Sequence, residues 1–105
     1  MAQFDVYRNR GQQRAVIPYL VTVQSQRFDA SGRRVVVPLL AAEPLAAADP
    51  GFTPSFSVEG RMVVLNPLDI VSVPAGVLGD WVCSLHEDGD RIIAAIDLLI
   101  SRAWG

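Results

Sequence analysis

The chain has 105 residues, half of them hydrophobic, and this length accommodates one compact domain but not two ordinary ones. Its nine basic residues, all arginines, stand against eleven acidic ones, and the net charge of −2 argues against a protein that binds nucleic acid mainly by neutralising phosphates. One cysteine and one histidine exclude an internal disulfide and a zinc site built from cysteine and histidine.

Strands dominate the first part of the chain, where hydrophobic and polar residues alternate with a period of two. The pattern predicts a first strand at residues 4–7 and a second at 19–24. A turn at 29–32 then leads into a third strand at 33–40. The polar loop between the first two strands carries three arginines, Arg8, Arg10 and Arg14. Two interpretations of this loop have equal weight: a docking site for an acidic partner through charge-assisted hydrogen bonds, or a solvated connection.

The third predicted strand contains three consecutive β-branched residues, Val35, Val36 and Val37, which favour a strand over a helix. Successive side chains of a strand point to opposite faces, so both faces of this strand are apolar. A small open sheet usually keeps one face polar and in contact with water. Either this strand is therefore central to a closed barrel, or a partner subunit covers its second face.

A hairpin is predicted in the middle of the chain, after a connection at residues 41–51 that is rich in alanine and holds at most one helical turn. Gly60 can adopt the positive φ that the tight turn of the hairpin requires. The two strands of the hairpin and a short strand after it are predicted at residues 55–58, 61–65 and 70–74. Residues 77–85 are ambiguous, because flanking glycines fit either a turn or a short helix.

The period changes to that of a helix near the C-terminus. Asp88, Gly89 and Asp90 offer an N-cap and negative charge to the start of a helix. Hydrophobic residues then recur at helical spacing, namely Ile92, Ile96, Leu99 and Ala103, and Ile93 and Ile100 are expected to widen this buried stripe. The pattern predicts an amphipathic helix of about 12–15 residues packed on the sheet. We therefore expect a mainly β protein, one domain over residues 1–105, in which a C-terminal helix caps a small barrel.

The residues with catalytic or metal-binding potential are few. Cys83 and His86 are spaced to share a helical face, but no third residue is identifiable to orient the imidazole, and we interpret them as a buried thiol and a surface side chain. The acidic residues around Asp88 are interpreted as a helix cap, because no further oxygen ligands follow at the spacing of a calcium loop. No metal or cofactor is expected.

The first residues lack the basic and then apolar run of a secretory signal, and no apolar stretch approaches the roughly 18 residues that cross a bilayer. A cytoplasmic protein that does not enter membranes is therefore expected. At the other end, Trp104 and Gly105 follow just after the predicted helix. The Trp104 indole either folds back on the barrel or is presented as a binding anchor, since tryptophan is enriched in interface hot spots.

Several short motifs follow one another along nearly the whole chain. They are Phe4-x-Val6-Tyr7, Val23-Gln24-Ser25, Asp29, Gly32-Arg33-Arg34, Val37-Pro38-Leu39, Ser72-Val73-Pro74, Ala95-Ile96-x-Leu98 and Trp104-Gly105. In this order and spacing they resemble the signature of the CcdB family, the gyrase-poisoning toxins of toxin–antitoxin operons. The resemblance implies a five-stranded, SH3-like barrel with a small extra sheet and a C-terminal helix. It also implies a homodimer with no enzymatic activity, in agreement with a partner subunit that covers the valine-rich strand.

The resemblance further implies a target, which is the dimerisation region of the DNA gyrase A protein. Toxins of this kind trap the state in which DNA is cut and covalently held, and their C-terminal tryptophan stacks on an arginine of gyrase. The residues carried over to this gyrase-binding face are Trp104, Gly105, Ser101, Ser25, Arg27 and Phe28. Ser101 is included because it occupies the anchor's place by an ungapped count, which puts the tryptophan about 4.5 Å further along a helix and about 60° round it. The family also often ends with one more apolar residue, which this chain lacks.

The partner that the resemblance implies is a small CcdA-like antitoxin with a disordered, acidic tail. The loop with Arg8, Arg10 and Arg14 is the expected docking region for that tail. No sequence-specific binding of nucleic acid by the toxin alone is expected.

Two alternative functions remain open. The barrel also resembles that of small endoribonuclease toxins, and a fold does not determine a function. Cleavage of RNA would need a basic group beside an acid, for example Arg33 or Arg34 with Asp29 or Asp69. The second alternative is a degenerate relative that only binds antitoxin.

Overall fold

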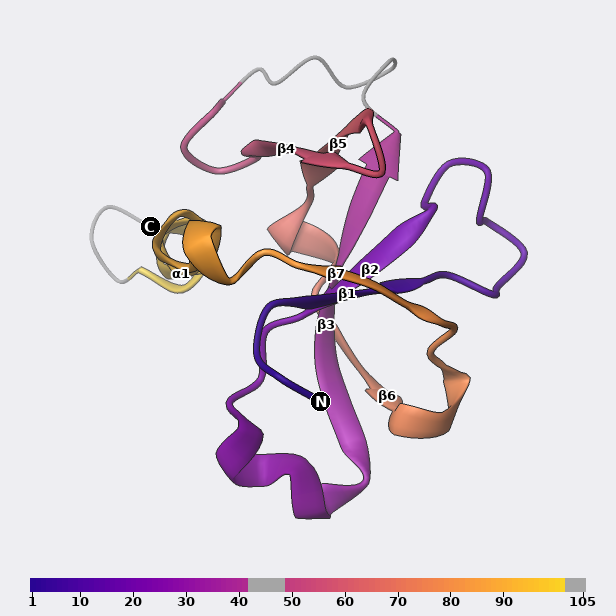
Figure 1. The fold of residues 1–105 in the computed structure, drawn as a ribbon. Coiled ribbons are helices and arrows are strands. Elements are labelled where there is room, and N and C mark those ends of the chain that lie inside the picture. The colour runs from indigo at the N-terminus through magenta and orange to yellow at the C-terminus, as the bar shows by residue number, and fades with distance from the viewer. Residues whose placement is uncertain (42–48, 102–105) are drawn as a thin grey trace.

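The computed structural model describes residues 1–41 and 49–101, which fold into a curled antiparallel sheet with one α-helix, α1, at Gly89–Ile100 (Figure 1). The seven strands are β1 Asp5–Arg8, β2 Tyr19–Thr22, β3 Arg33–Ala41, β4 Ser55–Val58, β5 Arg61–Leu65, β6 Val71–Pro74 and β7 Trp81–Ser84. Four short 3-10 helices join them: η1 Gln26–Ser31, η2 Pro67–Asp69, η3 Ala75–Val77 and η4 His86–Asp88. The predicted class, mainly β with a small SH3-like barrel and a C-terminal helix, is confirmed, and the described strands form the barrel as one curled sheet of seven strands.

The long strand β3 organises the sheet. The strand order is β4-β5-β3-β2-β1-β7, and β6 pairs with the first half of β3. On that edge β3 pairs with β6 through Val36 and with β5 from Leu39 onward, so Pro38 lies between the two partners. The missing N–H of Pro38 therefore removes no ladder hydrogen bond on that edge, which explains how a proline fits a central strand.

Both faces of β3 are buried by the chain's own residues. Val37 packs in the main core with Val6 and Ile92, whereas Val36 packs in a second cluster with Tyr7. Val36 and Val37 are completely buried. The explanation by a central position therefore holds for these two valines, and a partner subunit is not needed to cover them. The sheet is curled rather than closed, because the described end strands β4 and β7 do not pair with each other.

Helix α1 closes one end of the sheet through a narrower stripe than the sequence predicts. Ile92 and Ala95 are buried in the main core, and Ile96 packs against it. The expectation that Ile93 and Ile100 widen the buried stripe is wrong, because both side chains are exposed. No helix within residues 1–41 and 49–101 has the length and apolar character needed to span a membrane.

The start of α1 lies where the sequence predicts it, but its N-cap interaction differs. Asp88 occupies the N-cap position without a side-chain hydrogen bond to the helix backbone. Its carboxylate accepts instead from Arg91 Nη1 at 3.2 Å. The acidic residue thus serves an ion pair across one helical turn, which contributes little when both groups are exposed.

Two turns shape the hairpin and the last strand. Glu59 and Gly60 have φ values of 53° and 77°, as a two-residue hairpin turn of the primed type requires. The ambiguous residues 77–85 end η3 and then form β7, so the short last strand is the element that the pattern did not identify. A Cβ at Gly79 would lie 2.7 Å from the Arg8 carbonyl oxygen, so glycine permits the close approach of β1 to the chain that enters β7. The predicted connection at 41–51 falls largely outside the described residues.

Candidate protein-binding surfaces

Exposed hydrophobic side chains flank the outer face of α1, which also carries the charged residues Asp90 and Asp97. Ile93 and Leu98 are both exposed, and Ile100, in the last turn, is 68% exposed. Ser101 follows with an extended backbone and is also exposed. The predicted anchor residues Trp104 and Gly105 lie outside the described residues. The helix therefore presents hydrophobic side chains to solvent along the segment that leads to the predicted anchor.

A second exposed surface is formed by η1, which contains two of the predicted gyrase-binding residues. The Ser25 hydroxyl accepts a hydrogen bond from the Arg27 backbone N–H at 3.2 Å and so caps this short helix. Phe28 is 57% exposed, and the Arg27 guanidinium carbon lies 5.7 Å from the centre of its ring. This arrangement presents an aromatic ring with an adjacent cation, both suited to a protein interface.

The two surfaces lie apart within one chain. In Figure 1, η1 is the purple helical turn at the bottom, whereas α1 lies at the upper left. The helix packs on η2 and η4, whereas η1 packs on β3. A single copy of the chain therefore presents η1 and α1 as two separate surfaces.

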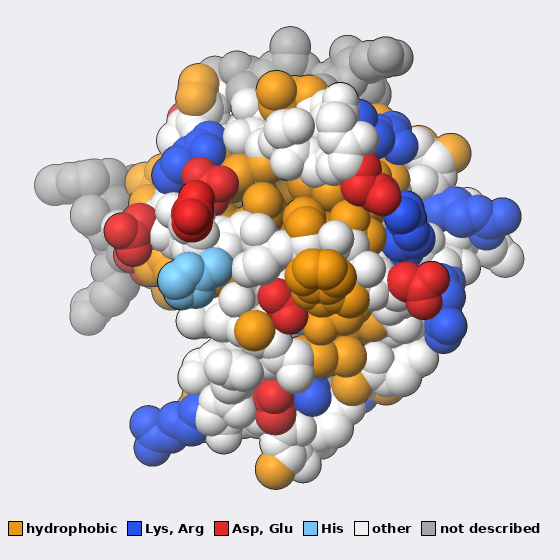
Figure 2. All heavy atoms as spheres, in the orientation of Figure 1, with side chains coloured by type: hydrophobic (Ala, Val, Ile, Leu, Met, Phe, Trp, Pro, Cys, Tyr) orange, Lys and Arg blue, Asp and Glu red, His pale blue; other side chains and the backbone are white. Residues whose placement is uncertain are grey.

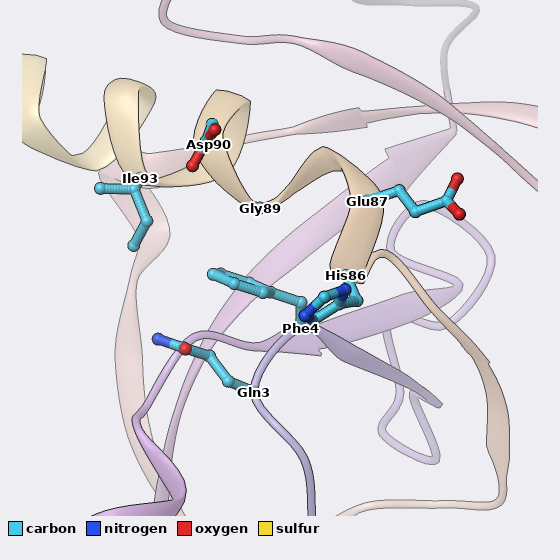
Figure 3. Close-up of a pocket in the computed structure, with 7 residues that line it drawn as sticks. All are labelled: Gln3, Phe4, His86, Glu87, Gly89, Asp90 and Ile93. Atoms are coloured by element: carbon cyan, nitrogen blue, oxygen red, sulfur yellow. The ribbon is translucent and has the colours of Figure 1, made fainter.

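A hollow of about 590 Å³ lies between the N-terminal segment and the start of α1. In Figure 3 the Phe4 ring lies below Gly89, with Gln3 on its other side and Ile93 further along the helix. Phe4 has a φ of 70°, a conformation that is strained for a residue with a bulky side chain, yet its side chain is buried. The contact between Phe4 and Gly89 therefore sets how α1 sits on the sheet.

Replacement of Gly89 by alanine is expected to destabilise the protein by about 1–3 kcal/mol, as overpacking of a core does. The new Cβ would lie 2.6 Å from Phe4 Cε2, and this clash outweighs the preference of about 1 kcal/mol that alanine has over glycine in a helix. Urea unfolding at equal protein concentrations measures the effect. Gly76→Ala is the matched control, because nothing lies within 4 Å of the added methyl group. Equal stability of the two variants would contradict this packing.

Arg8 ends β1, Arg10 and Arg14 lie in the loop after it, and the three arginines have different interactions. Arg8 Nη2 donates to Glu59 Oε2 at 2.6 Å, so Arg8 is already paired. Arg10 donates to the Gly76 carbonyl oxygen at 3.1 Å, and Arg14 donates to a carbonyl oxygen of its own loop at 3.5 Å. Neither Arg10 nor Arg14 forms an ion pair within the part of the chain that the structure describes. These two exposed cations remain available to an acidic partner.

Glu59 links the β4–β5 turn to the first two strands. Its carboxylate accepts from Arg8 and, through Oε1, from the Tyr19 hydroxyl at 2.6 Å. These hydrogen bonds, the one from Arg8 first, lower the pKa of Glu59 below its usual value. Burial and then the hydrogen bond to Glu59 raise the pKa of Tyr19. At neutral pH the carboxylate is therefore charged and the phenol protonated, which is the state that this contact needs.

The residues considered for nucleophilic catalysis lie in different elements. Cys83 is a partly buried residue of β7, and burial raises the pKa of its thiol, which lowers the thiolate fraction. His86 is exposed and lies in η4, beyond the end of that strand. In residues 1–41 and 49–101, no three His, Cys, Asp or Glu side chains come together as a group able to hold a metal ion.

The basic and acidic residues considered for RNA cleavage come together in one case. Arg34 Nε lies 3.7 Å from Asp29 Oδ1, but Arg34 is buried and its guanidinium also donates to two backbone carbonyl oxygens. The Arg33 guanidinium donates to the Ser72 hydroxyl at 2.8 Å and to the Ser72 carbonyl oxygen at 2.9 Å. Asp69, in η2, accepts from a neighbouring asparagine. The Arg34–Asp29 pair thus holds η1 against β3, and its guanidinium is occupied by contacts within the fold.

Comparison with models of protein families gives one match that spans almost the whole chain. Residues 3–101 match the family described as CcdB protein. The matched range contains every strand, η1 and α1, and it ends at the last described residue, before Trp104.

Proposed function

The chain belongs to the CcdB family, whose members are toxins of toxin–antitoxin systems, and from this premise we propose that it is a homodimeric toxin that poisons DNA gyrase. The family match over residues 3–101 carries this proposal. In the proposed complex the chain binds the gyrase A protein and traps the enzyme while its DNA is cut. The protein then acts by binding, without a chemical step of its own.

The exposed face of α1 supports this proposal. Ile93 and Ile100 lie one above the other on one side of the helix, and Leu98 adds an exposed apolar side chain on the opposite side, in the segment that precedes Trp104 in the sequence. Large apolar side chains of this kind gain most when a partner protein removes them from water. Trp104 would then stack on an arginine of gyrase as the anchor, with Gly105 after it, and Ser101 would lie at the rim of the same contact.

A homodimer would reconcile the positions of α1 and η1. Within one chain, η1 packs on β3, whereas α1 packs on η2 and η4, and the two elements lie apart in Figure 1. A two-fold axis can bring α1 of one protomer beside η1 of its partner, and it presents each surface twice to a target that is itself two-fold symmetric. The dimer is therefore part of the proposed binding site.

The proposed antitoxin contact relies on charged side chains, whereas the proposed gyrase contact relies mainly on apolar ones. Arg10 and Arg14 are exposed and have no acidic partner among the described residues, so they can bind carboxylates of an acidic tail. Neutralisation then depends on a surface distinct from α1 and η1. Arg8 lies next to this surface, where its ion pair with Glu59 holds the β4–β5 turn against β1.

Parallel incubations of the purified chain, with RNA in one and with gyrase and relaxed plasmid in the other, test this function. We expect loss of gyrase supercoiling and intact RNA. Cleaved RNA with fully active gyrase would instead support the endoribonuclease alternative. If the chain binds antitoxin tightly but affects neither substrate, it is a relative that has lost the poisoning activity.

A further inference from the structure

An exposed tryptophan lies on an edge strand, away from both proposed gyrase-binding surfaces. Trp81 begins β7 and is 58% exposed. β7 ends the strand order: it pairs with β1, and none of the described strands pairs with its other edge. An unpaired edge offers backbone N–H and C=O groups to an added strand. Figure 2 shows hydrophobic side chains exposed along the middle of this face, over β7 and β1.

The arginine loop packs directly against the segment that leads into β7. The Gly79 N–H donates to the Arg8 carbonyl oxygen at 3.0 Å, and the Arg8 N–H donates to the Asp80 carbonyl oxygen at 2.9 Å. Arg10 reaches the Gly76 carbonyl oxygen on the same segment. Arg10 therefore lies against the segment that leads to the exposed indole, and Arg14 belongs to the same loop.

This end of the molecule is basic although the chain as a whole carries a net charge of −2. The charged groups of the loop, of the neighbouring β4–β5 turn and of the strands around β7 are Arg8, Arg10, Arg14, Arg61, Glu59, Asp80 and Asp5. The four cations outnumber the three carboxylates. In Figure 2 blue side chains gather at the right-hand side, where the loop after β1 lies. The surface is therefore complementary to an acidic partner that carries an apolar residue for the indole.

We propose that Trp81 and the unpaired edge of β7 dock an extended, acidic segment of the antitoxin, with Trp81 as the anchor and Arg10 and Arg14 as the flanking cations. The identity of the partner rests on the proposed function, whereas its chemistry rests on this surface alone. An extended segment fits because it can add a strand to β7 and place alternate side chains on the indole. Carboxylates before or after that strand then reach the loop.

A peptide explains this surface better than a single-stranded nucleic acid does. A tryptophan beside arginines also suits the stacking of bases, but such proteins combine aromatic side chains with a positively charged groove that follows the backbone. Here the carboxylates of Glu59 and Asp80 lie among the cations, and Asp80 directly precedes the indole. Only a polypeptide can pair as an added strand with the unpaired edge of β7.

Fluorescence titration tests the proposal. The Trp104→Phe chain has Trp81 as its only tryptophan, and the probe is the purified antitoxin encoded in the same operon. We expect the emission of Trp81 to shift to shorter wavelength on binding, and amide hydrogens of residues 81–84 to exchange more slowly. By calorimetry with the full chain, Trp81→Ala should raise the Kd for antitoxin about 30-fold or more, as loss of a tryptophan hot spot does. Trp81→Phe should retain part of the affinity.

Leu68→Ala is the matched control, because Leu68 is 67% exposed but lies in η2. The Kd of this variant for antitoxin should stay within about twofold of the value for the unmodified chain. An unchanged Kd for a folded Trp81→Ala variant would overturn the proposal. A shift of Trp81 emission with an oligouridine in place of antitoxin would also overturn it, in favour of RNA. A change of oligomeric state in Trp81→Ala would overturn it in favour of a second copy of the chain.

The same variant separates this inference from the proposed function. Trp81→Ala should still arrest growth and inhibit gyrase, but antitoxin should no longer rescue the cells. If the unmodified chain never inhibits gyrase while antitoxin binding depends on Trp81, the proposed function fails and the docking surface stands. If gyrase is inhibited and antitoxin binding ignores Trp81, the docking surface fails and the proposed function stands.

Discussion

Removal of Trp104 and Gly105 is expected to abolish growth arrest while the fold and the dimer persist. Helix α1 ends at Ile100, and its buried contacts come from Ile92 and Ala95, so the shortened chain keeps every described core contact. A tryptophan hot spot contributes about 2–4 kcal/mol to binding, so the affinity for gyrase should fall about 30-fold to 1000-fold. Induced expression with a count of surviving colonies measures the result.

Circular dichroism and sedimentation of the shortened protein provide the folding and dimer controls. Trp104→Phe is the milder variant, which keeps an aromatic ring for stacking and should retain part of the toxicity. A shortened chain that still arrests growth would move the anchor to the segment around Ser101, which is exposed at the end of α1. A shortened chain that loses its dimer would instead assign Trp104 to the interface between protomers.

Reversal of two charges, Arg10→Glu with Arg14→Glu, is expected to weaken antitoxin binding at least about tenfold, because each new carboxylate repels an acidic tail. The loss of affinity should come mainly from a lower association rate constant, and it should become smaller as salt is added. Stopped-flow association at two salt concentrations measures both effects. Arg8 is left intact, because its ion pair with Glu59 holds the hairpin turn and its reversal would disturb the fold.

Arg27→Glu is the matched control for this charge reversal. Arg27 is equally exposed and its replacement reverses the same type of charge, but it lies in η1 on the proposed gyrase face. It should leave antitoxin binding nearly unchanged and weaken gyrase inhibition. Unchanged antitoxin affinity in the double variant would remove the loop from the antitoxin site, whereas an equal loss with Arg27→Glu would show a general effect of charge.

Local signals sufficed for much of the fold. The alternation in β1 and β2, the valines of β3 and the turn at Gly60 each act over a few residues, so a pattern of period two identifies them. β7 was missed because it has four residues, an exposed tryptophan and an irregular register with β1. The positive φ of Phe4 has no sequence signal, because this residue is held by contacts with distant parts of the chain, including Thr22, Leu85 and Gly89.

The candidate surfaces were less predictable because they depend on contacts between distant residues. Arg8 and Glu59 are 51 residues apart in sequence, so the linear pattern grouped Arg8 with Arg10 and Arg14 although its guanidinium is already paired. Ile93 and Ile100 carry the same hydrophobic signal as Ile92, and only the position of the sheet decides which of them is buried. The surface around Trp81 arises in the same way, where β1 and β7 meet.

Trapping of cut DNA tests gyrase poisoning by this chain most directly. The purified chain is incubated with gyrase, supercoiled plasmid and ATP, and the mixture is then treated with detergent and protease before electrophoresis. We expect linear plasmid, in an amount that rises with the concentration of the chain, and we expect none with the chain that lacks Trp104 and Gly105. Plasmid that remains supercoiled at saturating dimer, with gyrase fully active, would contradict it.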